Sequence, residues 1–215
     1  MNRPGTVRIP DGAVIVEGAL EVPQDARGLV LFAHGSGSSR HSPRNNYVAA
    51  VLREAGIGTL LMDLLTPEED LDYERRFDIG LLTRRLLAAA RWAATRPATR
   101  DLPLGFFGAS TGAAAALEAA AAMGGDVQAV VSRGGRPDLA SRVALAMVSA
   151  PTLLLVGGRD YEVIELNRMA YDRLQCEKSL HIVPGATHLF EEPGTLDTVA
   201  REAAAWFAGH FVKAA

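Results

Sequence analysis

The sequence has little of what several classes of protein require. A single cysteine, Cys176, excludes an internal disulfide framework and a metal site made of cysteines alone. The formal net charge is −3, which indicates no basic surface for nucleic acid or anionic lipid. The N-terminal residues lack the apolar core of a signal peptide. The most apolar run, 113–123, is too short for a membrane span and is interrupted by Glu118.

Length and composition indicate an ordinary globular domain. The 215 residues, 48% hydrophobic and 22% charged, suffice for one domain (1–215) with a sizeable core. We therefore expect a soluble, cytoplasmic protein that acts on a small molecule and binds neither nucleic acid nor membrane. The sequence leaves a monomer and a homodimer equally open.

Short β-like runs alternate with longer helical patterns along the chain. Strands are expected at 14–22, 29–33, 58–63, 104–107, 129–132, 152–156 and 179–183. Helices are expected at about 44–55, 77–95, 111–123, 162–174 and 195–211. This alternation predicts an α/β fold with a mostly parallel sheet and helices on both faces. The first strand precedes the alternation and is open to antiparallel pairing at an edge.

Two of these segments carry further information. The helix at 111–123 is almost all alanine, which predicts a buried helix close to the sheet. The helix at 77–95 has leucines and alanines at helical spacing, and three arginines fall outside that stripe: Arg84, Arg85 and Arg91. The charged segment before it, 67–76, is expected to be a solvated loop or the opening turn of that helix.

The stretch Gly-Ala-Ser-Thr-Gly, 108–112, has the form G-x-S-x-G between an expected strand and an expected helix. That context is the one a nucleophile elbow requires: a tight turn with small flanking residues that lifts Ser110 above the sheet. The helix N-terminus beneath it favours developing negative charge. Two alternatives are a simple turn with Ser110 as helix N-cap and a phosphate-binding loop, although the lysine of a P-loop is missing.

A serine nucleophile needs a histidine as base. His188 lies in a Gly/Pro-bounded loop after the last strand, at the carboxyl edge of the sheet where ligands bind in open α/β folds. We predict His188 as the base, with His41 as the alternative. His181, inside a strand, and His210, in the last helix, are expected to be structural or surface residues.

A carboxylate must orient that histidine. Asp160 follows the end of the strand at 152–156, and Asp63, which also ends a strand, is its main rival. A purely structural role for Asp160 would be the N-cap of the next helix. We predict Asp160 as the acid.

The order Ser110, Asp160, His188 is the chain order of α/β-hydrolases. Four segments carry the resemblance to the compact dienelactone-hydrolase-like branch of that superfamily: 34–45, 108–112, 157–160 and 185–188. The resemblance covers nearly the whole chain and implies a serine nucleophile, with no metal and no organic cofactor. Dienelactone hydrolases proper typically use cysteine, so serine at 110 favours a general carboxylic-ester hydrolase.

The same resemblance implies an oxyanion hole made of two backbone N–H groups, those of Thr111 and Ser36. Two arginines, Arg40 and Arg133, are candidates for binding a substrate carboxylate or phosphate. The structural alternative for them is an ion pair with Asp138 or Asp63.

We therefore expect a serine esterase or lactonase that forms an acyl-enzyme at Ser110. Acyl transfer on the same triad and a non-catalytic binding module are the alternatives. The interval 134–150 has room for one crossover helix, so no lid domain is expected and the site should be open and suited to small substrates. The loop at 64–76 is the one segment that could fold over it.

Overall fold

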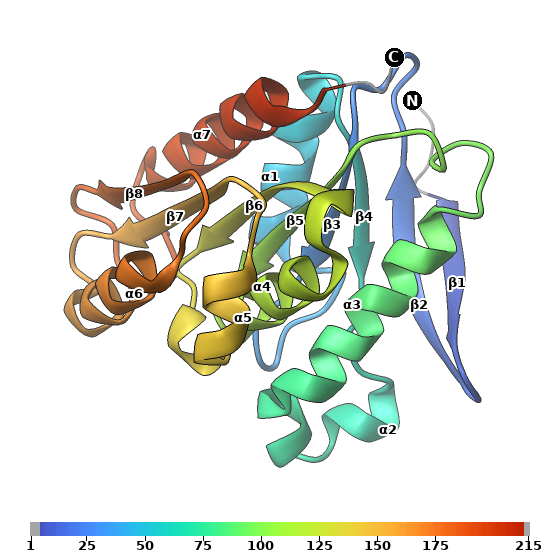
Figure 1. The fold of residues 1–215 in the computed structure, drawn as a ribbon, viewed down its shortest axis with the longest axis horizontal. Helices are drawn as coiled ribbons and strands as arrows, with labels where there is room; N and C mark the ends of the chain where they lie inside the picture. The colour runs from blue at the N-terminus through green and yellow to red at the C-terminus, as the bar shows by residue number, and fades with distance from the viewer. Residues whose placement is uncertain (1–4, 213–215) are drawn as a thin grey trace.

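A computed structural model describes residues 5–212 and contains an eight-stranded sheet in the order β1-β2-β4-β3-β5-β6-β7-β8 (Figure 1). The strands from β3 to β8 are parallel, and β1 and β2 are antiparallel to their neighbours. Their bounds are β1 Gly5–Asp11, β2 Val14–Glu21, β3 Leu29–Ala33, β4 Gly58–Met62, β5 Leu104–Ala109, β6 Val127–Arg133, β7 Thr152–Gly157 and β8 Lys178–Val183.

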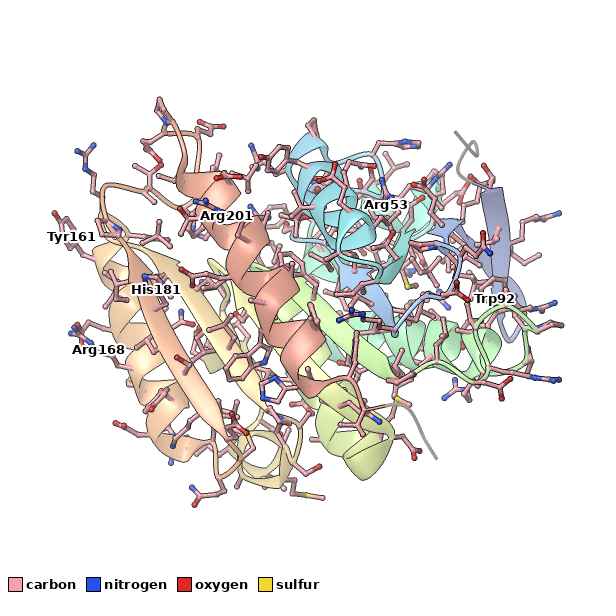
Figure 2. All side chains as sticks on the ribbon, turned by 90° about the horizontal axis from the view of Figure 1, so that it is seen from above. Arg53, Trp92, Tyr161, Arg168, His181 and Arg201 are labelled. Carbon is pink, nitrogen blue, oxygen red and sulfur yellow. The ribbon has the colours of Figure 1, made fainter. Side chains whose placement is uncertain are left out.

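Helices cover both faces of this sheet, as the alternation predicts. On one face lie α1 (Pro43–Glu54) and α7 (Thr195–His210), which pack side by side; Figure 2 looks onto this face, with Arg53 and Arg201 marking the two helices. The opposite face carries α3 (Ile79–Ala93), α4 (Thr111–Met123), α5 (Arg142–Met147) and α6 (Tyr161–Arg173). The α/β class with a mostly parallel sheet is confirmed.

The core consists of one apolar layer on each side of the sheet. All residues of β3 and β4 are buried, because helices cover both of their faces. The alanines of α4 are buried as expected, apart from Ala122, and the small side chains let the helix lie close to β5. Within residues 5–212, no helix combines the length and apolarity needed to cross a bilayer.

The N-terminal strand β1 was not expected from the sequence. Only Ile9 of its seven residues is buried, and Pro10 interrupts the pattern, so the apolar signal is weak. Proline is tolerated there because β1 is an edge strand. The expected first strand, β2, does pair antiparallel, but it lies between β1 and β4 and is not the edge.

The expectation that Arg85 lies outside the buried face of its helix is wrong. Only 2% of Arg85 is exposed, and its guanidinium forms ion pairs with Asp11, at the end of β1, and with Glu69, 2.7 Å away. Glu69 belongs to α2 (Pro67–Asp70), which Thr66 caps through its side chain. A 3₁₀ turn, η1 (Glu74–Phe77), follows, so the segment at 67–76 contains ordered turns that contribute to this ion-pair network.

The interval between β6 and β7 contains a 3₁₀ turn, η3 (Pro137–Leu139), and the six-residue α5. One further 3₁₀ turn, η2 (Gly124–Asp126), ends α4. No lid domain is inserted in this interval of the described chain, which leaves the carboxyl edge of the sheet without that cover.

Candidate active site

Ser110 sits at the junction of β5 and α4 in a backbone conformation that serine rarely adopts, φ 50° and ψ −123°. A positive φ in a non-glycine residue costs free energy and persists only where the surroundings enforce it. Although Ser110 occupies the N-cap position of α4, its side chain makes no capping hydrogen bond. The hydroxyl is therefore available for another task.

Steric contacts explain the two glycines of the motif. A Cβ on Gly108 would lie 2.4 Å from the Cα of Ala113, and one on Gly112 would lie 2.1 Å from the carbonyl oxygen of Ala33. Both distances are far below van der Waals contact, so any side chain would push α4 away from the sheet. The G-x-S-x-G pattern thus reflects the close approach of β3, β5 and α4.

His188 and Asp160 form a short hydrogen bond at the same edge of the sheet. The distance from His188 Nδ1 to Asp160 Oδ2 is 2.6 Å, and because a carboxylate only accepts, Nδ1–H is the donor. Asp160 precedes α6, yet its side chain makes no capping hydrogen bond there and faces His188. The loop of His188 is fixed by Glu192, whose carboxylate accepts the Thr187 N–H at 3.0 Å; this bond lowers the pKa of Glu192.

The segment after β6 connects the serine turn to the histidine loop. The Arg136 N–H donates to the Ser110 carbonyl oxygen at 3.0 Å, and the Ser110 N–H donates to the Arg133 carbonyl oxygen at 3.4 Å. On the other side, a Cβ on Gly134 would lie 3.6 Å from His188 Cε1. Residues 133–136 therefore contact both the nucleophile turn and the histidine loop.

The two residues whose backbone N–H groups are expected to form an oxyanion hole lie at the start of α4 and in the loop after β3. Thr111 is the first residue of α4, so its N–H has no acceptor within the helix. The loop after β3 passes close to the serine: a Cβ on Gly35 would lie 3.0 Å from the Cβ of Ser110. Ser36 follows in an exposed turn of this loop.

The sequence did not assign a role to His34, whose ring connects the loop after β3 to Leu64. The Leu64 N–H donates to His34 Nε2 at 3.0 Å, so the ring proton is on Nδ1, which donates to the Gly35 carbonyl oxygen at 2.9 Å. Burial lowers the pKa of His34 and keeps the ring neutral. In the sequence, the position of His34 directly before Gly35 was the signal that could have indicated this role.

The rival candidates are engaged elsewhere. Asp63 accepts hydrogen bonds from the Arg40 backbone N–H, at 2.8 Å, and from the Arg40 side chain. His41 is exposed on the loop that precedes α1. Two other histidines hydrogen-bond to carboxylates on other elements: His181 on β8, labelled in Figure 2, to Glu202 of α7, and His210 to Glu177.

The two candidate arginines have opposite surroundings. Arg40 forms ion pairs with Asp63 and with Glu17, the latter at 2.5 Å. Its role is therefore the structural one considered from the sequence, an ion pair with Asp63. Arg133 is 7% exposed, and among residues 5–212 its guanidinium donates one hydrogen bond, to the side-chain oxygen of Asn45 at 3.3 Å. Burial, together with the nearby Arg44, lowers the pKa of Arg133 to about 10.

The expected carboxylate partners of Arg133 are not beside it. Asp138 pairs with Arg136 at 2.8 Å, and Asp63 pairs with Arg40. No carboxylate among residues 5–212 forms an ion pair with Arg133, although it remains protonated at neutral pH. Across the same residues, no three His, Cys, Asp or Glu side chains gather as metal ligands.

The strand order, the serine turn after β5 and the position of the acid and histidine after β7 and β8 define an α/β-hydrolase. The crystal structure of a dienelactone hydrolase from Anabaena variabilis is 55% identical, has a TM-score of 0.94, and is matched over 98% of this chain and 99% of that one. The chain belongs to the dienelactone-hydrolase-like branch of the α/β-hydrolases.

Two further comparisons are with a solved structure of low sequence identity and with two longer relatives. A lidless serine hydrolase of Xanthomonas campestris shares the fold at 20% identity, with a TM-score of 0.78 over 100% of this chain and 98% of that one. Two Mycobacterium tuberculosis proteins with the description "Putative phosphoribosyl transferase" are each 59% identical over 204 residues, 95% of this chain. The chain spans 46% of those relatives' length. No protein-family model matches the chain.

Proposed function

We propose that this protein hydrolyses small carboxylic esters or lactones through an acyl-enzyme at Ser110. The observation that carries the proposal is the 2.6 Å bond between His188 and Asp160, at the sheet edge where Ser110 is held in a strained turn. A carboxylate-bound histidine and an uncapped serine hydroxyl are the parts that nucleophilic catalysis of acyl transfer needs.

Each residue has a defined role in the proposed reaction. Ser110 Oγ attacks the substrate carbonyl carbon while His188 Nε2 accepts the hydroxyl proton, and Asp160 stabilises the resulting imidazolium. The carbonyl oxygen becomes an oxyanion that accepts hydrogen bonds from the Thr111 and Ser36 N–H groups. His188 then protonates the leaving alkoxide, and a water molecule, activated by the same histidine, hydrolyses the ester of Ser110.

We expect the proposed site to favour short acyl groups. A cavity of about 130 Å³ lies between the loop after β3 and α2, lined by residues that include His34, Asp63, Leu65 and Pro67. Ser110, Asp160 and His188 are not among its lining residues, so its volume sets no limit on the acyl group. No lid encloses a long chain, whose additional CH₂ groups would each contribute about 0.8 kcal/mol if buried.

The preference for short chains is tested with p-nitrophenyl esters from acetate to laurate. We expect kcat/KM to be highest for the short esters and to stay level or fall beyond them. A steady rise toward laurate would show an enclosing apolar channel and would contradict the open site. Partition of the acyl group between water and an added alcohol, measured in the same assay, separates hydrolysis from acyl transfer.

We do not propose phosphoribosyl transfer, the activity in the description of the mycobacterial relatives, for this chain. The chain accounts for less than half of their length, and the serine turn with its histidine and carboxylate serves acyl chemistry. The proposed reaction uses side chains and backbone N–H groups alone, in line with the expectation of no cofactor.

Covalent labelling tests the proposal directly. A fluorophosphonate should modify Ser110, identified by mass spectrometry of the labelled peptide, and should abolish hydrolysis of p-nitrophenyl acetate. Ser110→Ala should take up no label, whereas Ser141→Ala, which removes the N-cap of α5, should label like the unmodified protein. Labelling of another residue, or equal labelling of Ser110→Ala, would exclude Ser110 as the nucleophile.

A further inference from the structure

A fully buried amide connects α6 to the segment that follows β6. Asn167 is 0% exposed, and its Nδ2 donates to the carbonyl oxygens of Gly135, at 3.0 Å, and of Val163, at 2.8 Å. Carbonyl oxygens only accept hydrogen bonds, so the amide nitrogen must face them. The amide oxygen has no donor among residues 5–212. Because the buried face of a helix is ordinarily apolar, an amide that is only partly satisfied there indicates a specific role for the bond to Gly135.

Steric contacts fix Gly135 on its other side. A Cβ on Gly135 would lie 2.0 Å from Ser132 Oγ, on β6, and 2.6 Å from the Cβ of Ala113, on α4. Both distances are far below van der Waals contact, so the backbone of Gly135 packs directly against these two elements. The hydrogen bond from Asn167 adds α6 as a third support.

The residues on either side of Gly135 contact the proposed nucleophile turn and the loop of the proposed base. The Arg136 N–H donates to the Ser110 carbonyl oxygen at 3.0 Å. A Cβ on Gly134 would lie 3.1 Å from the His188 carbonyl oxygen and 3.6 Å from its Cε1. The carbonyl group that α6 holds therefore lies within a three-residue stretch, 134–136, that contacts both proposed catalytic residues.

The helix that carries Asn167 begins at the proposed acid. Asp160 is the residue directly before α6, and its carboxylate accepts the hydrogen bond from His188 Nδ1 at 2.6 Å. The helix also packs against η3, which follows the 134–136 stretch. Asn167 lies about two turns into α6. Its bond to Gly135 therefore couples the acid–base pair to the stretch that holds Ser110.

We propose that Asn167 is a positioning residue, which holds the Ser110 turn in place relative to the proposed acid and base. The inference rests on the proposed function and adds to it a residue that acts through the 134–136 stretch and not on the substrate. Rates depend steeply on the alignment of nucleophile and base, and a displacement of about 1 Å can cost about a hundredfold. Loss of this one hydrogen bond should slow the reaction although every catalytic group is still present.

The rate at which a fluorophosphonate labels Ser110 measures this alignment. Asn167→Leu keeps a similar side-chain volume and removes the bond to Gly135. We expect its second-order rate constant for labelling, and its kcat for p-nitrophenyl acetate, to fall by about tenfold to a hundredfold. Thr152→Val is the matched control, because it also removes a buried side-chain hydrogen bond, the 2.9 Å bond to the Ala150 carbonyl oxygen, at the end of β7 remote from the acid. This control should label like the unmodified protein.

A double-mutant cycle separates positioning from a general loss of folded protein. Combined with Asp160→Asn, which disables the base, Asn167→Leu should lower the remaining kcat by less than about twofold, because no active pair is left to align. A purely structural defect would lower kcat by the same factor in both backgrounds. Equal factors, or labelling of Asn167→Leu within about twofold of the unmodified protein, would overturn the inference and leave Ser110 as the nucleophile.

A second substitution keeps the test decisive if Asn167→Leu does not fold. Asn167→Asp keeps the size of the side chain, but a carboxylate cannot donate to the Gly135 carbonyl oxygen, whereas the protonated acid can. Burial raises the pKa of such a carboxyl group, so the labelling rate relative to the unmodified protein should be low at about pH 8 and recover toward about pH 5.

The outcomes of this second experiment are equally distinct. A relative labelling rate near one throughout, or one that does not change with pH, would overturn the inference and leave the proposed function standing. An unmodified protein that neither takes up the label nor hydrolyses esters would refute the proposed function, and the inference with it.

Discussion

Two arginines are almost completely buried, and the regions around them differ in charge. Arg85, on α3, contacts the carboxylates of Asp11 and Glu69, which come from the end of β1 and from α2. Arg133, at the end of β6, has the amide of Asn45 and the cation of Arg44 as its polar neighbours. Arg85 therefore connects α3, β1 and α2 through ion pairs, whereas Arg133 has no ion-pair partner among the described residues.

The difference indicates that the two regions contribute to different properties. Removing one partner of a buried ion pair leaves the other charge uncompensated, so loss of Arg85 should destabilise the fold. Arg133 bears that cost without compensation, as residues kept for function often do. Four predictions follow from this comparison, and they run from the largest expected effect to the smallest.

The largest effect is expected for the chemistry beside Arg133. Asp160→Asn and His188→Ala should each lower kcat for p-nitrophenyl acetate by a factor on the order of 10³ or more, with circular dichroism unchanged. His41→Ala, which changes an exposed histidine, is the control and should retain activity. If Asp63→Asn lowers kcat more than Asp160→Asn does, the acid has been assigned to the wrong strand.

Substitution of Arg85 should reduce stability strongly. Arg85→Met removes the buried cation from the carboxylates of Asp11 and Glu69, which keep only the more distant and exposed Arg84 and Arg75, and we expect the free energy of unfolding to fall by about 3 kcal/mol. Urea denaturation measures this change. Arg84→Met, the neighbouring residue with an exposed side chain and a 3.4 Å contact to Asp11, should cost less than about 1 kcal/mol.

Substitution of Arg133 should act in the opposite direction. Because Arg133→Met removes an uncompensated buried charge and keeps an apolar side chain, the free energy of unfolding should rise by about 1–2 kcal/mol. The pKa of Arg133 is lowered on folding, so its charge disfavours the folded state at every pH below about 10. A loss of stability in the same urea experiment would show that Arg133 makes structural contacts comparable to those of Arg85.

The smallest effect concerns His34, a buried base that stays neutral. Its folded-state pKa lies below the value in the unfolded chain, so the unfolded state takes up the proton first as the pH falls. Its contribution to stability is therefore present above pH 6.5 and is lost toward acid, with a slope of at most about 1.4 kcal/mol per pH unit for one proton. Urea midpoints between pH 7 and 5 should fall more steeply for the unmodified protein than for His34→Gln; parallel curves would contradict this.

Much of the fold could be predicted because the apolar patterns are local. The runs that became β3 and β7 are continuously apolar and are buried on both faces, and the alanine block became α4 with the expected bounds of 111–123. The strand β1 escaped prediction because an edge strand buries little; its pairing with β2 depends on the turn at Gly12, which has φ 61°. A single buried residue in seven gives no periodic signal.

The candidate site was predictable to a different degree for each residue. The serine turn can be located from its glycines, since their necessity comes from contacts between adjacent elements. The choice of His188 and Asp160 followed from their positions after strands, but their 2.6 Å contact depends on the parallel pairing of β7 and β8. The role of His34 required its contact with Leu64, thirty residues away in the chain.

The sequence by itself determined the α/β class and the order of the strands from β2 onward, because these depend on periodicity, and it supplied the residue types on which the proposed site rests. Tertiary structure alone decided which charges are paired. Arg40, Arg85 and Arg133 look alike in the sequence, yet the first two meet carboxylates from distant elements and the third does not. The physical reason is that desolvation and Coulomb energy depend on burial and on distances of a few ångströms, which the folded chain sets and local sequence does not.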